Sequence, residues 1–250
     1  MGIGTALISG AALFLMQAFP VNTVFWPALF VWLAIFSFIY FFTKSHLDWK
    51  VGVYSLAITS IFALTGLIGV IEVPFVRTTI SVLGALSLGL LYSFGIEGTI
   101  VTWLSKKPFI RFMMIFWVFN AYALSTLFFA FQTFFPGTLS FIVLLLGGGC
   151  MYGAIALMIW RMYFSTRIEP LYVWASLMIF VTMECLWVIH LLPFAYPVLA
   201  FFATWVWYLI HLLARFHFTK RDIIWKKQHN FIIANIILFI LILLFFVKWV

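Results

Sequence analysis

Two carboxylates stand inside long apolar stretches of this 250-residue chain. Glu97 lies in the segment LGLLYSFGIEGTIVTW and Glu184 in the segment VTMECLWVIH. An acidic side chain near the centre of a bilayer costs on the order of 3 kcal/mol, so it is expected to face other helices or a wet cavity. Desolvation would also favour its protonated form. The two residues therefore suggest a membrane site that handles protons, cations or a small ligand.

The composition of the chain indicates that these carboxylates are surrounded by lipid unless other helices cover them. Hydrophobic residues make up 66% of the sequence and charged residues 8%, and the mean hydropathy is +1.22. A soluble domain carries about 25% charged residues, which this chain cannot supply. Apolar runs of ~20 residues recur from end to end, which is the pattern of membrane-spanning helices. We therefore predict an all-α, polytopic transmembrane bundle that forms a single integral membrane domain over residues 1–250.

The polar breaks between the apolar runs predict nine spans. Their ranges are 3–19, 23–42, 51–71, 79–104, 112–135, 139–160, 171–192, 196–214 and 231–247. If successive loops alternate between two sides, twelve of the fourteen lysines and arginines fall on the side of the N-terminus. The positive-inside rule makes that side cytoplasmic and places the C-terminus outside. We expect a multi-pass protein of a cell membrane, by its small layout a prokaryotic cytoplasmic membrane.

The predicted outer turns resemble one another. Each is short and contains a proline, at residues 18–22, 72–77, 134–138 and 191–197. This spacing indicates four helical hairpins, each entering and leaving from the cytoplasmic side, and one closing helix. Short connections between helices favour proline and glycine in any case, so the pattern does not require an internal repeat.

Several residues of the predicted spans could surround the two carboxylates. Asn120, Tyr122 and Gln132 are the polar neighbours that we assign to the hypothetical ligand or proton site. Small residues in 79–104, and the pair Gly149 and Gly153 in 139–160, allow close helix packing, so these two spans are predicted at the centre of the bundle. The structural alternative is that each glutamic acid is neutral and hydrogen-bonds a backbone carbonyl to hold two helices together.

The longest predicted cytoplasmic loop, residues 215–230, is basic and has an amphipathic pattern. Its candidate contacts with anionic lipid headgroups are Lys220, Arg221, Trp225, Lys226 and Lys227. A loop that only sets topology, or one that binds a cytosolic protein, explains the same residues. The formal net charge of +8 is assigned to this lipid-facing role, and no nucleic-acid partner is expected.

Motifs with a recognisable chemistry are missing from the sequence. There is no H-E-x-x-H pair, histidine box or cysteine cluster, so neither a metal site nor another cofactor is predicted. The G-x-S-x-G and Walker A patterns are also absent, which does not favour an enzyme. His190 and His211 are expected at the membrane interfaces, near the ends of their spans.

Three classes of function remain open at this point. The first is a small transporter or ligand-handling protein whose site contains Glu97 and Glu184, near the depth at which transporters bind their substrates. The second is a non-catalytic membrane scaffold or accessory subunit that binds another membrane protein. The third, which has the least support, is a membrane enzyme that acts on lipid-linked substrates at the basic cytoplasmic face.

Overall fold

The computed structural model describes residues 2–19, 22–42, 47–95, 106–163, 168–218, 229 and 233–241. Within these residues the secondary structure is helical, without strands. The elements are α1 (Gly2–Ala18), α2 (Asn22–Phe42), α3 (Leu47–Val70), α4 (Pro74–Gly95), α5 (Lys106–Phe134), α6 (Thr138–Ile142), η1 (Val143–Gly147), α7 (Gly148–Tyr163), α8 (Ile168–His190) and α9 (Tyr196–Phe218). Residues 233–241 form a further helical stretch.

Six helices of the described chain are long and apolar enough to cross a membrane. They are α3, α4, α5, the continuous α6–η1–α7 rod, α8 and α9. The helices α1 and α2 are apolar but contribute shorter windows. The predicted all-α class is thus confirmed, and the helices are compatible with a multi-pass membrane protein. The number of nine spans and the orientation of the termini remain predictions.

Prolines mark several helix starts. Pro74 is the first residue of α4, Pro108 and Pro170 are the third residues of α5 and α8, and Pro197 is the second residue of α9. Proline is tolerated in the first turn because the N–H that it lacks would have no partner within the helix. This explains why α4 begins five residues before the predicted range, and why the residues that precede it form a short turn.

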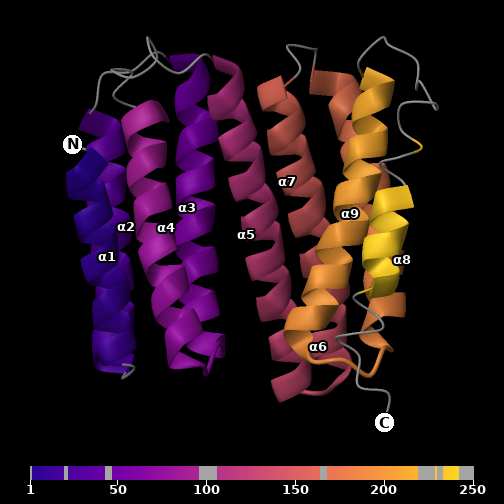
Figure 1. Ribbon diagram of the computed structural model, residues 1–250, viewed down its shortest axis with the longest axis horizontal. Coiled ribbons are helices and arrows are strands. Elements are labelled where there is room, and N and C mark those ends of the chain that lie inside the picture. Colours follow the sequence, from indigo (N-terminus) through magenta and orange to yellow (C-terminus); the bar gives the residue numbers. More distant parts are fainter. Residues whose placement is uncertain are drawn as a thin grey trace.

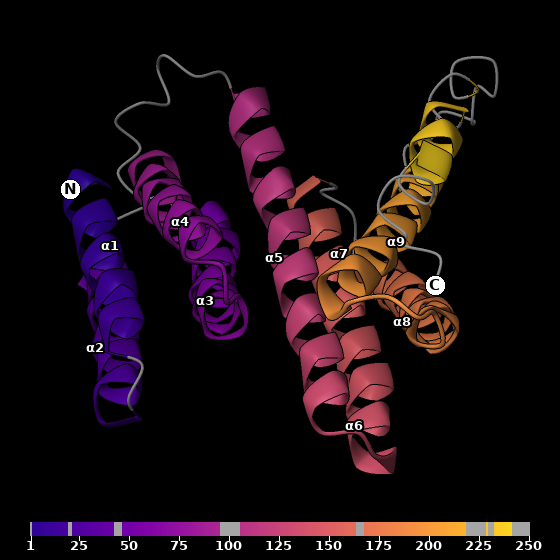
Figure 2. The same cartoon turned by 60° about the horizontal axis from the view of Figure 1, so that its bottom comes forward.

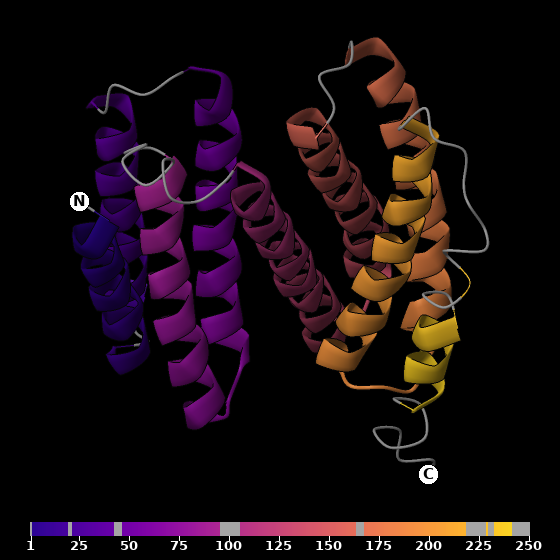
Figure 3. The ribbon, with the colours of Figure 1, turned by 45° about the horizontal axis from the view of Figure 1, so that its top comes forward.

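The helices are arranged around α5, as Figures 1 and 2 show. On one side α5 packs against α3, which contacts α4, and α4 in turn packs against α1. On its other side α5 contacts α7 and α9, and α8 packs against both of these helices. Figure 3 shows the same division, with α1–α4 on one side of α5 and α7–α9 on the other.

The proline-bearing turns lie at one end of the bundle. Figure 1 shows the α3–α4, α5–α6 and α8–α9 connections together at the lower end, as four hairpins would require. The α3–α4 connection is held by Arg77, which donates from Nε and Nη2 to the Ile71 carbonyl oxygen at 3.0 and 2.7 Å. Tyr196, at the start of α9, donates to the Val70 carbonyl oxygen at 3.1 Å. These bonds satisfy carbonyls at the end of α3 and place a cation where the helix dipole is negative.

The centre of the bundle differs from the prediction. The windows of α3 and α5 are each 56% buried, whereas those of α4 and of the α6–η1–α7 rod are 39% and 44% buried. The small residues of α4 do produce close packing, because a Cβ on Gly89 would lie 2.9 Å from the Gly2 carbonyl oxygen of α1. The remaining face of α4 stays exposed through Leu83, Leu86 and Leu90. The small residues in the sequence therefore predicted which helices pack closely in pairs, but they did not predict which helix is central.

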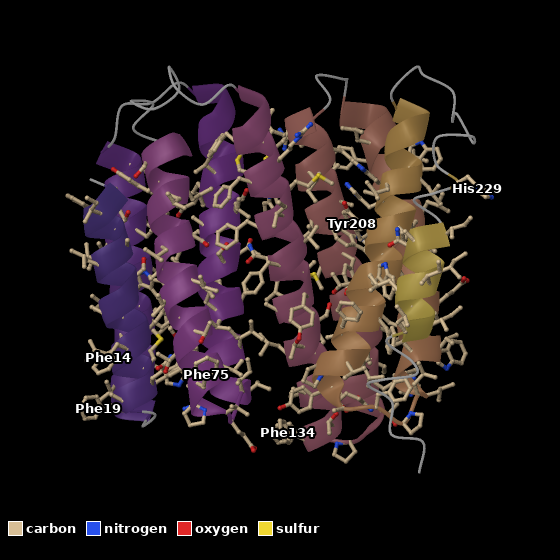
Figure 4. The ribbon with its side chains drawn as sticks, in the orientation of Figure 1. Phe14, Phe19, Phe75, Phe134, Tyr208 and His229 are labelled. Carbon is tan, nitrogen blue, oxygen red and sulfur yellow. The ribbon has the colours of Figure 1, made fainter. Side chains whose placement is uncertain are left out.

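The outer surface of the bundle is apolar. Figure 4 shows Phe14 and Phe19, from α1 and its end, projecting away from the ribbon, with Phe75 and Phe134 towards its lower end. All four side chains are more than half exposed. A water-facing surface does not expose so many large apolar side chains. The structure therefore suggests that a lipid bilayer surrounds the helices.

Candidate functional site: the polar side chains of the bundle

Glu184 lies on the outer surface of α8, where its side chain is exposed. No residue of the described chain forms a hydrogen bond or ion pair with its carboxyl group. The position is within the apolar window Leu171–His190 of the helix. The expectation that Glu184 faces the bundle interior is therefore wrong. Glu97 lies outside the described residues, so the proposed pairing of the two carboxylates remains a prediction.

The exposed face of α8 has a regular pattern. Val173, Leu177, Phe180, Glu184 and Trp187 follow one another at spacings of four, three, four and three residues. Residues with this spacing fall on one side of an α-helix, and it is the spacing by which helices pair along a seam. The four apolar members are between 50% and 70% exposed. Only 28% of the α8 window is buried, the smallest share among the six candidate spans.

The opposite face of α8 packs closely on α7. A Cβ added to Gly153 would lie 2.3 Å from Cγ1 of Ile179 and 3.3 Å from the Ala175 carbonyl oxygen. One turn earlier, a Cβ on Gly149 would lie 2.5 Å from Cγ of Met183. The G-x-x-x-G pair therefore lets the two backbones approach, as the sequence suggested. Because α7 holds α8 by this face, the seam that contains Glu184 is directed outwards.

Asn120 is fully buried on α5 and bonds to α3. Its Nδ2 donates to the Ser60 hydroxyl at 2.7 Å, and Ser60 donates to the Leu56 carbonyl oxygen at 2.6 Å. The Oδ1 atom of Asn120 has no hydrogen-bond partner among the described residues. Asn120 bonds to α3, whereas α8 contacts α7 and α9, so Asn120 and Glu184 lie in different parts of the bundle.

Tyr122 and Gln132 are half-buried at other positions of α5. Gln132 lies twelve residues beyond Asn120, which corresponds to about 18 Å along the helix at 1.5 Å per residue. Its Oε1 is buried without a hydrogen-bond partner in the described part of the chain. The predicted site residues that the structure describes therefore do not converge on one point.

A second buried polar group was not predicted from the sequence. On α5, α7 and α9, Ser125 donates to the Tyr152 hydroxyl at 2.6 Å, and that hydroxyl lies 2.8 Å from Oγ1 of Thr204. All three side chains are buried. Their types are common in apolar helices, and nothing in their sequence spacing reveals that three helices bring them together. We call these three residues the hydroxyl cluster.

Aromatic rings continue from the hydroxyl cluster towards the end of α9. The ring of Trp207 lies 5.2 Å from that of Tyr152 and 5.4 Å from that of His211. On its other side, His211 stacks on Trp160 of α7 at 5.5 Å with an interplanar angle of 6°. His211 is 1% exposed, so its ring is enclosed by protein, and its expected position at a membrane interface remains a prediction. The two tryptophans hold its ring between α7 and α9.

The structure provides no support for the other candidate sites. Among the described residues, no group of three or more His, Cys, Asp or Glu side chains could hold a metal ion. The predicted lipid-headgroup contacts Lys220, Arg221, Trp225, Lys226 and Lys227 lie outside the described residues. Gly147 lies in the π-helical turn η1, within the continuous α6–η1–α7 rod.

The chain matches no protein-family model, no curated protein and no solved structure. The geometry of this bundle is therefore the only basis for a proposed function.

Proposed function

We propose that the protein is a non-catalytic subunit of a membrane assembly, and that the outer face of α8 binds a transmembrane helix of a partner protein. The observation that carries this proposal is the exposed position of Glu184 within an apolar window of α8. A carboxyl group directed into lipid costs several times the thermal energy, which favours a protein neighbour in the native membrane.

The residues around Glu184 support a helix as that neighbour. The four-three spacing of Val173, Leu177, Phe180 and Trp187 offers a seam along which a second helix can pack. The partner helix would place a hydrogen-bond donor or a basic side chain opposite Glu184, since polar side chains fasten membrane helices. A second copy of the same seam is a poorer match, because it would bring two carboxyl groups together.

The buried polar residues also support a structural role over transport. Asn120 is bonded to Ser60, and the hydroxyl cluster is bonded within itself, so these groups join helices. A groove between α4 and α5 is lined almost entirely by apolar side chains. The transport hypothesis required Glu184 to share an interior site with Glu97, and the outward position of Glu184 weakens it.

The size of the complex extracted from native membranes tests the proposal. Wild-type protein and the variants Glu184→Leu, Glu184→Gln and Glu72→Gln would be extracted in mild detergent and compared by native gel electrophoresis. Glu72 is the matched control, because it is an exposed carboxylate that belongs to the α3–α4 turn and not to α8.

Wild type and Glu72→Gln should migrate as a complex larger than the chain alone, and Glu184→Leu should lose the partner. Glu184→Gln should retain part of the complex, since an amide still forms hydrogen bonds. A Glu184→Leu complex of unchanged size and abundance would sink the proposal. If two differently tagged copies of the chain pair through α8, the proposed partner protein would be wrong, and the face would instead serve self-association.

A further inference from the structure

A groove between α4 and α5 lies on a different face of the bundle from Glu184. Its volume is about 230 Å³, and it is lined by Ile80, Leu83, Gly84, Phe112, Ile115 and Phe116, among other residues. Leu83 and Ile115 are 58% and 70% exposed, so the groove opens on the outer surface. Its floor lies against α3, because a Cβ on Gly84 would meet the Leu64 side chain at 2.6 Å.

One wall of the groove is a ladder of aromatic rings on α5. The rings of Phe112 and Phe116 are stacked at 5.9 Å, and those of Phe116 and Phe119 at 6.2 Å. Ser87 is the only hydroxyl-bearing residue in the lining. Such a surface has few hydrogen-bonding groups for a polar solute, and it favours a flexible hydrocarbon chain.

A cationic side chain, Arg111, lies beside this apolar groove, nearer to the start of α5. Arg111 is exposed, and it precedes Ile115 by four residues, which places both on the same side of α5. No described residue forms an ion pair with its guanidinium group. Side chains on a helix point back towards its N-terminus, so Arg111 extends away from the groove towards the end of the bundle where α5 begins.

We propose that this groove holds one acyl chain of an anionic phospholipid whose phosphate binds Arg111. Basic residues beside grooves between transmembrane helices are a known arrangement for anionic lipid headgroups. Arginine suits a phosphate because its guanidinium donates two parallel hydrogen bonds.

The dimensions of the groove agree with an acyl chain. Arg111 and Phe119 are eight residues apart, or about 12 Å along α5. One leaflet of a hydrocarbon core about 30 Å thick spans about 15 Å, so a chain that starts near Arg111 can follow the groove towards the bilayer centre. An apolar cavity of about 150 Å³ is sufficient for benzene, which makes a groove of 230 Å³ large enough for part of an acyl chain.

Native mass spectrometry of the full chain, purified in detergent with phosphatidylglycerol or phosphatidylcholine added, tests this proposal. The probe variants are Arg111→Gln, which removes the charge, and Ser87→Phe, which fills the groove. Arg161→Gln is the matched control for charge, because Arg161 is an exposed basic residue in the last turn of α7. Leu90→Phe is the control for bulk, because Leu90 is exposed on α4 outside the groove lining.

Wild type should retain phosphatidylglycerol in preference to phosphatidylcholine. Arg111→Gln should lower phosphatidylglycerol retention about fivefold with little effect on phosphatidylcholine, as expected for one basic residue near a headgroup. Ser87→Phe should reduce retention of both lipids, and the two controls should behave as wild type. Circular dichroism and size-exclusion profiles would confirm that each variant is folded.

Three results would overturn the assignment. Equal losses in Arg111→Gln and Arg161→Gln would show that charge alone, at any position, attracts the lipid. Full retention in Ser87→Phe would mean that the acyl chain does not use the groove. Displacement of the lipid by inorganic phosphate would show that the guanidinium binds a free anion without the groove, and crosslinking of two copies through Ile115 would identify a protein occupant.

Discussion

Asn120 on α5 and Ser60 on α3 form a direct hydrogen bond of 2.7 Å between the two helices whose windows are the most buried of the six candidate spans. Both side chains are fully buried. A residue that the sequence offered as part of a ligand site therefore fastens two helices in the structure. Tyr152, which was not predicted from the sequence, also fastens helices, because its hydroxyl joins α7 to α5 and α9.

The Asn120–Ser60 bond should contribute measurably to stability. Replacing Asn120 with Ala should lower the free energy of unfolding by about 1 kcal/mol, since interhelical hydrogen bonds in membranes average ~0.6 kcal/mol and reach ~1.7 kcal/mol. Unfolding of the detergent-solubilised protein by SDS would measure the change. A double-mutant cycle with Ser60→Ala should give a coupling energy of about 0.6 kcal/mol, and strict additivity of the two variants would contradict the bond.

The Tyr152 hydroxyl should matter independently of its ring. Tyr152→Phe keeps the aromatic contact with Trp207 but leaves Ser125 and Thr204 without their shared partner. We expect a loss of about 1 kcal/mol in the same SDS assay. Tyr172→Phe is the control, because that tyrosine is exposed on α8 and should tolerate the change. Equal stability of the two variants would mean that the hydroxyl cluster contributes nothing.

The close approach of α7 and α8 should be sensitive to a single methyl group. In Gly153→Ala the new Cβ would overlap Ile179 and press on the Ala175 carbonyl oxygen. Overpacking of this kind costs about 1–3 kcal/mol. Gly69→Ala on α3 is the matched control, since nothing lies within 4 Å of its Cβ position, and this change should be neutral or slightly stabilising. A destabilised Gly69→Ala with an unaffected Gly153→Ala would contradict the packing.

Much of the fold could be predicted from the sequence, because the physics of membrane helices is local. Apolar length and the polar breaks between apolar runs located α5, α8 and α9 to within a few residues, except that α5 begins at Lys106, six residues earlier than predicted. The side on which a polar residue lies depends on how helices rotate against their neighbours. Glu184 points outwards because α7 packs on the opposite face of α8 through Gly149 and Gly153. The sequence pattern of a single helix does not reveal which face packs on a neighbour. The hydroxyl cluster was missed for the same reason.

The predicted membrane orientation can be tested at the two ends of the bundle. After Cys150 and Cys185 are replaced with Ala, single cysteines would be introduced at Gly137 in the α5–α6 turn and at Arg161 near the end of α7. Both positions are exposed. A membrane-impermeant maleimide applied to intact cells should label Gly137→Cys and spare Arg161→Cys, because basic ends remain in the cytoplasm. The opposite labelling pattern would invert the predicted topology.

Site-specific photo-crosslinking in the native membrane tests the binding face of α8 most directly. A photoreactive amino acid would replace Phe180 or Trp187, which flank Glu184, or Leu86 on the exposed face of α4 as the control. We predict a discrete protein adduct from both α8 positions, lost in a Glu184→Leu background, with its crosslinked peptide in an apolar helix that carries a basic or amide side chain. The control should give lipid adducts alone, and lipid adducts alone from Phe180 and Trp187 would contradict the proposed assembly role.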